Sequence, residues 1–217
     1  MNFKIKKYIK IFQMVVLIMI IPTFAFTVNF KLNVGKTTSN TGSYEIGFAN
    51  GVSATASQQP SSDFNFNGEV ILYDYFSLGL GLITNTGKYS VNYDGRSLVA
   101  FDTKTYTIIS SKSYLFEHIK EFLITNYYIG IDYILIQNKF SLTDPSSQSV
   151  TVEEFDESFT SNGTGLSFGA EIMFHSSGLR LEYTLLDVSG VKNSVNDISV
   201  RYELKGAAYT IGVLLYI

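Results

Sequence analysis

The amino-acid sequence predicts an all-β fold: an eight-stranded antiparallel up-and-down transmembrane β-barrel with short periplasmic turns and long extracellular loops. Apolar residues recur at every second position over most of the chain, which is typical of strands. The 217 residues are 46% hydrophobic but only 16% charged, whereas ordinary soluble domains carry roughly 25% charged residues. Beyond the N-terminus, no apolar run reaches the roughly 18 residues that a membrane-spanning helix needs.

The composition excludes several other classes of protein. A chain with 17 Phe and 15 Tyr offers too much burial for a disordered protein. The absence of Cys excludes a disulfide framework and a thiolate metal site. The net charge of −3 excludes a strongly basic nucleic-acid binder. We expect no cofactor and no nucleic-acid partner.

Residues 1–25 have the pattern of a secretory signal peptide, followed by the barrel domain at 26–217. Four lysines and no acidic residue occupy positions 1–10, an apolar run follows at 11–21, and Ala25 precedes the expected cleavage site. An uncleaved anchor helix is the alternative, but 11 residues are too few to span a bilayer. Removing four of the 16 Lys and Arg leaves 12 against 19 acidic residues, a net charge of −7.

The strands are expected where apolar residues alternate with Gly, Ser, Asn or isolated charges. In chain order, the alternating sets cover residues 44–48, 64–72, 76–82, 127–135, 166–174, 179–185 and 209–217. A further strand is expected at 101–116, where Lys112 shares a face with Ile108, Tyr114 and Phe116. Residues 28–34 alternate as well, and an extra strand there is the alternative. One more strand would make the count odd and break the alternation of turn lengths, so residues 26–42 are interpreted as an N-terminal arm or an extension of the first strand.

A soluble sandwich or lipocalin-like barrel would alternate as well. The apolar faces run for about ten residues, which suits the roughly 9–11 residues of a tilted membrane strand better than the roughly 5–6 of a soluble one. Aromatic residues also gather at the ends of the segments, as in interfacial girdles. We therefore expect Leu80, Ile131 and Leu181 to face hydrocarbon, and Gly81 and Thr184 to face the lumen.

The connections between strands alternate in length. Short ones are expected at 73–76, 117–122 and 175–178, and long polar ones at 55–63, 90–100, 141–163 and 189–200. Outer-membrane barrels keep short turns in the periplasm and long loops outside. The alternation predicts eight strands, with both termini in the periplasm.

The C-terminal segment resembles the terminal signal of bacterial outer-membrane barrels. Thr210, Gly212, Leu215 and Ile217 match its pattern, although the family usually ends in an aromatic residue. Segments 68–81 and 178–183 also resemble hairpins of small barrels. The chain is thereby similar to the OmpA/OmpX/OmpW-like β-barrel superfamily. This resemblance implies a location in the bacterial outer membrane and a C-terminal strand that the barrel-assembly machinery recognises.

Five charged residues fall on the faces expected to line the lumen: Glu69, Asp132, Glu171, Arg180 and Glu182. The interior of an eight-stranded barrel is just wide enough for side chains to fill, and charges there must be paired or hydrated. The first interpretation is a structural plug of ion pairs and water. The alternatives are a narrow gated pore or a pocket for a small apolar ligand.

The two histidines offer little chemistry. The sequence around His175 is similar to the His-x-Ser motif of barrel-type lipid A deacylases, but the Asn that follows in that motif is missing. His175 is also expected in a periplasmic turn, away from the outer leaflet. With His118 expected in a different turn, we predict no catalytic residue and no metal site.

The longest expected loop carries Glu153, Glu154, Asp156 and Glu157 without any basic residue. A solvated face is the plain interpretation. Bridging to lipopolysaccharide through divalent cations and binding of a surface partner are the alternatives.

The sequence thus predicts a monomeric, non-catalytic integral protein with a structural or surface-interaction role, in contact with outer-membrane lipid and lipopolysaccharide. The alternative is a narrow channel or transporter for small solutes or hydrophobic molecules, as in the OmpW-like branch. A lipid-modifying barrel enzyme is the remote alternative.

Overall fold

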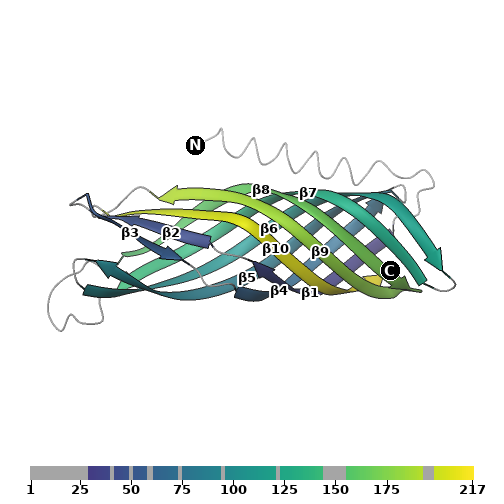
Figure 1. The fold of residues 1–217 in the computed structure, drawn as a ribbon, viewed down its shortest axis with the longest axis horizontal. Coiled ribbons are helices and arrows are strands. Elements are labelled where there is room, and N and C mark those ends of the chain that lie inside the picture. Colours follow the sequence, from purple (N-terminus) through teal and green to yellow (C-terminus); the bar gives the residue numbers. More distant parts are fainter. Residues whose placement is uncertain are drawn as a thin grey trace, which may run out of the picture.

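The computed structural model describes residues 29–39, 42–48, 51–57, 61–72, 75–93, 96–120, 123–143, 155–192 and 198–217. The expected signal peptide lies outside these residues. The described residues form ten strands, all paired antiparallel (Figure 1). The strands are β1 (Asn29–Ser39), β2 (Gly42–Gly47), β3 (Ser53–Ser57), β4 (Ser61–Leu72), β5 (Phe76–Tyr93), β6 (Arg96–Lys120), β7 (Leu123–Thr143), β8 (Phe155–Phe174), β9 (Ser177–Lys192) and β10 (Ser199–Tyr216). No helix among the described residues is long and apolar enough to cross a bilayer.

Eight of these strands close a ring. Their order is β1-β4-β5-β6-β7-β8-β9-β10, and β10 pairs back with β1, with Leu32 opposite Leu215 and Gly35 opposite Gly212. The amide of Phe30 also donates to the carbonyl oxygen of Ile217 at 3.1 Å. The predicted eight-stranded antiparallel barrel is therefore confirmed.

The first strand of the ring differs from the predicted one. It is β1, which pairs along its length with β4 and β10, and not the segment around 44–48. The described part of segment 26–42 thus forms part of the barrel wall and is not a free arm. The second interpretation of that segment fits better, because β2 continues beside β10 where β1 ends, with Gly42 opposite Leu204.

We call the end of the barrel that holds Asn29 and Ile217 the proximal end, and the end that holds the β2–β3 hairpin the distal end (Figure 1). The β4–β5, β6–β7 and β8–β9 connections lie at the proximal end and are short, as the sequence predicts. The side of the membrane on which this end lies stays a prediction.

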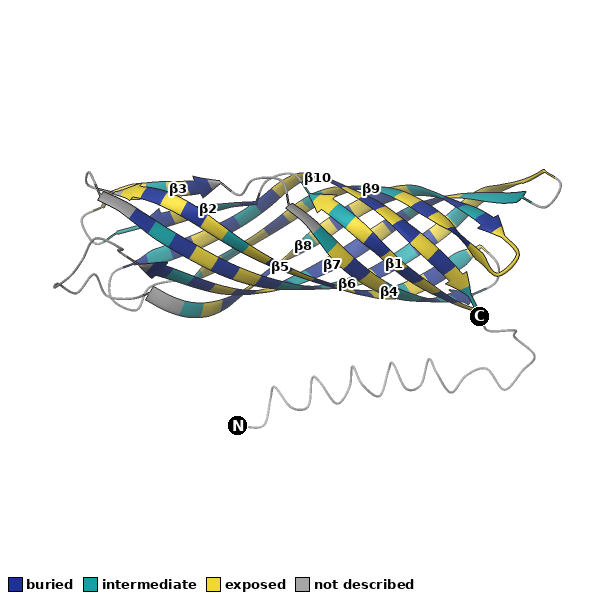
Figure 2. Cartoon of the chain, turned by 90° about the horizontal axis from the view of Figure 1, so that it is seen from below, coloured by how far each residue is buried: buried dark blue, intermediate teal, exposed yellow. Residues whose placement is uncertain are grey.

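An apolar belt surrounds the proximal half, where exposed and buried residues alternate along each strand (Figure 2). The exposed fractions of Leu80, Ile131 and Leu181 are 55%, 64% and 47%. Gly81 and Thr184 are buried on the inner side. Other exposed members of the belt are Leu32, Phe66, Leu82, Ile109, Phe168, Ile211, Val213 and Leu215. The outer surface of this half therefore has the apolar character that a bilayer requires.

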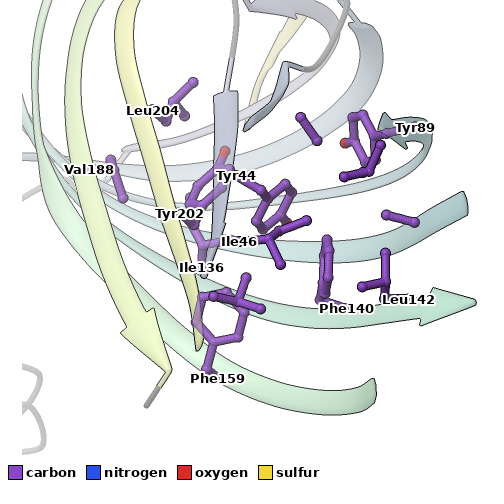
Figure 3. Close-up of a cluster of buried hydrophobic side chains, with 14 of the residues drawn as sticks. Tyr44, Ile46, Tyr89, Ile136, Phe140, Leu142, Phe159, Val188, Tyr202 and Leu204 are labelled. Atoms are coloured by element: carbon purple, nitrogen blue, oxygen red, sulfur yellow. The ribbon is translucent and has the colours of Figure 1, made fainter. Parts of the chain in front are cut away.

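The distal half has the opposite arrangement, because its apolar side chains point inward. Tyr44 and Ile46 of β2 are fully buried, so the alternating set at 44–48 lies inside the barrel and not on a lipid-facing wall. They belong to an apolar cluster that also draws residues from β3 and from each strand between β5 and β10 (Figure 3). It includes Tyr89, Val91, Leu98, Ile136, Phe140, Leu142, Phe159, Val188, Val200, Tyr202 and Leu204.

Three of the expected long loops are largely strand. The segment 90–100 is a paired hairpin up to Tyr93 opposite Arg96, and β3 and β4 occupy much of 55–63. Strands β7 and β8 leave only residues 144–154 of the expected 141–163 loop between them. These loop predictions were wrong because the strands continue past the apolar belt as a barrel wall. Glu153 and Glu154 lie outside the described residues.

The sequence suggested that Lys112 and Phe116 share a face, but in the structure they lie on opposite faces. The pairing of β6 with β7 shifts register between Tyr114 and Phe116, which is a β-bulge at Leu115. One extra residue reverses the direction of the side chains that follow. Lys112 is thereby buried in the lumen while Phe116 is 61% exposed on the outside.

Candidate functional site: a charged lumen, a small cavity and an apolar compartment

Arg180 of β9 lies at the centre of an ion-pair network in the proximal lumen. Its Nη1 and Nη2 donate to the two carboxylate oxygens of Glu69 on β4, at 2.6 and 2.7 Å. Its Nε donates to Oε1 of Glu171 on β8 at 3.1 Å, and Nη2 reaches the same oxygen. All three side chains are almost fully buried. A planar guanidinium suits this arrangement because it presents five donors in a fixed geometry.

Two lysines, Lys31 on β1 and Lys112 on β6, extend the network. Lys112 Nζ lies 2.8 Å from Glu69 Oε1 and 2.7 Å from Glu182 Oε2. The hydroxyl of Tyr128 donates to the same Glu182 oxygen at 2.7 Å. Lys31 Nζ lies 2.5 Å from Glu171 Oε2.

The network holds equal numbers of positive and negative groups, Lys31, Lys112 and Arg180 against Glu69, Glu171 and Glu182. Taking charges out of water costs several kcal/mol each in a real protein. Close pairing and shared hydrogen bonds offset this cost, so the six residues form a charge-balanced plug. We call them the lumen network.

Glycines make room for the lumen network. A Cβ at Gly79 would lie 2.9 Å from Glu69 Cγ, and one at Gly130 would lie 3.0 Å from Lys112 Cγ. Real Cβ atoms essentially never approach to less than 3.0 Å. The small residues that the sequence places on the inner faces therefore accommodate long charged side chains.

The structure brings four of the five predicted lumen charges together: Glu69, Glu171, Arg180 and Glu182. Asp132 of β7 is buried too, but none of the ion pairs found among the described residues of this cluster includes it, and it lies on the wall of a cavity. Sequence reasoning missed Lys31 and Lys112 as members. The sequence did hold a signal for Lys31, because it lies between the apolar residues Phe30 and Leu32 and so belongs to the opposite face of the strand.

The cavity lies between the lumen network and the distal apolar cluster. Its volume is about 80 Å³. Lys112 and Glu182 border it toward the proximal end, and Tyr106 and Leu204 border it toward the distal end. Its lining combines amide, hydroxyl and carboxylate groups with isoleucine side chains. The polar part comes from Asn33, Asn65, Asn67, Ser110 and Asp132.

A second buried ion pair, Asp102–Lys104 on β6, lies in the distal apolar compartment. The hydroxyls of Tyr44 and Tyr89 donate to the Asp102 carboxylate at 2.7 and 3.0 Å. Burial lowers the pKa of Lys104, and the Asp102 charge opposes this effect. Burial, and then the neighbouring Asp102 charge, raise the pKa of Tyr44. Sequence reasoning missed this pair, because it identified 101–116 only as a strand.

The two histidines are exposed, and none of the hydrogen bonds or ion pairs described for these clusters includes them. His175 lies in the β8–β9 turn with a φ of 54°, and His118 lies near the end of β6. Within the described ranges, no group of three or more His, Cys, Asp or Glu side chains is arranged to hold a metal ion.

The C-terminal residues that match the barrel signal divide between the two faces of β10. Thr210 is buried and Gly212 lies over Asn33 on the inner side. Leu215 and Ile217 are 49% and 71% exposed on the outside. The strand that carries them is the one that closes the ring with β1.

The comparison with solved structures found several proteins similar to this chain. The outer membrane protein OprG from Pseudomonas aeruginosa has a TM-score of 0.60 and 15% sequence identity, over 88% of this chain and 96% of that one. Ail of Yersinia pestis has a TM-score of 0.44 and 8% identity, over 88% and 100%. The protease OmpT from Escherichia coli has a TM-score of 0.43 and 9% identity, over 90% and 99%.

No protein-family model and no curated protein sequence matches the chain. The similarity to OprG identifies the fold as that of small outer-membrane β-barrels. It leaves activity open, because one fold hosts many functions.

Proposed function

We propose that this protein is a non-catalytic integral barrel of the bacterial outer membrane, with a structural and surface-interaction role. The observation that carries the proposal is the lumen network, which fills the proximal half with three acidic and three basic side chains. The apolar cluster fills the distal half. A lumen blocked at two levels favours a structural barrel over an open pore.

The apolar belt and the distal wall support the membrane and surface parts of this proposal. The belt covers the proximal half, so the distal half extends beyond the bilayer and presents the β2–β3 hairpin and the ends of the other strands (Figure 2). We propose that the proximal end faces the periplasm, where the short turns of such barrels lie. Recognition of β10 by the barrel-assembly machinery and contact of the distal end with lipopolysaccharide are part of the same proposal.

Planar-bilayer recording of the purified, refolded protein tests this role. We expect no discrete conductance steps from the natural sequence. Steps that change in Arg180→Ala but not in the surface control Arg201→Ala would contradict a closed structural barrel.

Those steps would support the second candidate, a narrow channel or transporter for small solutes or hydrophobic molecules. The cavity between the two filled regions favours this candidate, because it leaves space in the middle of the lumen. The lumen network would then act as the gate.

A further inference from the structure

The β6–β7 hairpin leaves one edge of strand β6 open at the proximal end. The ladder between β5 and β6 ends with the hydrogen bond from the Tyr114 amide to the Tyr75 carbonyl oxygen, at 2.8 Å. Beyond that point, β6 stays paired with β7 on one side. On its other side, no described strand pairs with residues 115–120. The hairpin extends beyond the rest of the proximal rim (Figure 1).

The open edge continues past the membrane interface. Phe116 and Tyr127 stack with their ring centroids 4.8 Å apart, and aromatic residues of β-barrels gather at the interface between membrane and water. Glu117, His118 and Lys120 follow on β6, and all three are exposed. Unpaired N–H and C=O groups on a strand in water form a template on which another strand can pair.

A pocket of about 340 Å³ adjoins this edge at the mouth of the lumen. Its apolar and aromatic lining includes Ile71 on β4, Tyr114 on β6 and Tyr216 on β10. Successive side chains of an added strand point to opposite faces of the sheet, so every second one faces the pocket. An open edge beside a side-chain pocket is the arrangement by which proteins bind extended peptides.

The charge of the pocket favours a basic side chain. The Nζ of Lys31 lines the pocket but is committed, because it lies 2.5 Å from Glu171 Oε2 and donates to the Tyr114 hydroxyl at 2.9 Å. Glu117 lines the same pocket, and none of the ion pairs found among the described residues includes it. Because exposed ion pairs contribute little, main-chain hydrogen bonds should supply most of the affinity.

Neither the distal edges nor a second copy of the chain offers an equivalent arrangement. In the distal wall, β3 pairs with β2 alone, and β5 pairs with β4 no further than Ile83 opposite Asn65. Cα atoms of β3 and β5 come within 8 Å of each other, so these two edges cover one another. A second barrel inserted the same way in the membrane presents its own β6 in the same direction. The two β6 edges therefore cannot form the antiparallel pairing that all described strands use.

We propose that residues 115–120 of β6 bind an extended peptide segment of another protein, which adds to the barrel as an antiparallel strand. A basic side chain of the peptide lies beside Glu117, and an apolar one lies against Ile71 and Tyr216. The identity of the partner as a periplasmic protein rests on the proposed orientation of the proximal end. Binding of the peptide does not depend on that orientation or on whether the barrel conducts.

Fluorescence anisotropy tests the proposal with the barrel refolded into nanodiscs, which leave both ends accessible. The probe is a fluorescein-labelled hexapeptide amide, Val-Thr-Lys-Thr-Val-Thr, whose valines and lysine share one face. We expect saturable binding. Methylating the alternate backbone nitrogens that face β6 should weaken it about tenfold or more, whereas methylating the other alternate set, the matched control, should change it little.

A variant and a second measurement locate the site. Glu117→Gln should weaken binding by up to about fivefold, as expected for an exposed ion pair. Asp187→Asn, an exposed position on β9, is the matched control and should bind as the natural sequence does. Hydrogen exchange should slow at amides of residues 115–120 when the peptide binds, and should stay unchanged at residues 53–57 of β3.

Four results would overturn the proposal. The first is the absence of peptide binding. The second is equal binding of both methylated peptides, which would exclude strand addition. The third is slowed exchange at β3 instead of β6, which would move the site to the distal wall. The fourth is a dimer in which residues 115–120 are protected without peptide, which would make a second copy the occupant.

Discussion

At the scale of single residues, Arg180 has the largest influence on the lumen. Its guanidinium joins Glu69 on one side and Glu171 on the other, and all three groups are removed from solvent. Removing one partner of a buried pair leaves an uncompensated charge, which costs more than the pair itself contributes. The lumen network therefore makes the proximal barrel sensitive to one side chain.

We predict that Arg180→Met lowers the free energy of unfolding by about 3–5 kcal/mol. Denaturant titration of the barrel refolded in lipid vesicles measures this change. Arg201→Met is the control, because Arg201 is half exposed and pairs with Glu203 on the surface, where ion pairs contribute about 0–1 kcal/mol. Equal effects of the two substitutions would show that the lumen network is not the stabilising feature.

At the scale of the strands, side chains alternate between the inner and the outer face along the whole of a strand. The face that carries the apolar residues, however, changes partway along it. On β10, Val200, Tyr202 and Leu204 point inward, whereas Ile211 and Val213 point outward. Apolar side chains of the proximal wall thus face outward, as a bilayer requires, whereas those of the distal wall face the lumen. The phase change marks the distal edge of the apolar belt.

We predict that Leu80→Arg, Ile131→Arg and Leu181→Arg each destabilise the barrel by about 2–4 kcal/mol near the middle of the bilayer, and by less toward its edges. A guanidinium facing lipid loses hydration that it keeps in water. Reversible folding into vesicles with denaturant titration gives the free energies.

The control for the belt is Val191→Arg. Val191 is 56% exposed on the outer face of β9, but it lies beyond Asp187 and Ser189, past the apolar belt. It should tolerate arginine with little loss. Destabilisation at Val191 as large as at Leu181 would shift the membrane boundary to include the distal half.

At the scale of the whole molecule, the barrel is longer than its apolar belt and is divided into three layers. The lumen network occupies the proximal part, the cavity of mixed lining the middle, and the apolar cluster the distal part. Only the proximal part has an outer surface covered by apolar side chains, as contact with lipid requires. The distal part resembles a soluble barrel placed on top of a membrane barrel.

We predict that the distal end faces the cell exterior. The chain contains no Cys, so single cysteines can be labelled cleanly. A membrane-impermeant maleimide added to intact cells should label Ser90→Cys on the distal part of β5, and should label Ser176→Cys in the β8–β9 turn only after permeabilisation. The reverse pattern would invert the orientation.

The sequence by itself determined the strand class, the ring of eight and the outward direction of Leu80, Ile131 and Leu181, because alternation depends only on neighbouring residues. It also placed Glu69, Glu171, Arg180 and Glu182 on inner faces. It did not identify β1 as the first wall strand, and it predicted loops where the strands continue past the belt.

Only the tertiary structure decided which inward charges meet. Contacts such as Arg180 with Glu69 join positions separated by 111 residues, and the stagger between strands determines them. The bulge at Leu115 likewise changes which face Lys112 and Phe116 occupy, without a marker in the local pattern. Alternation cannot tell an apolar face that meets lipid from one that fills a lumen, because both exclude water. The pairing of β2 with β10 made that distinction, because it places Tyr44 and Ile46 inside the distal wall.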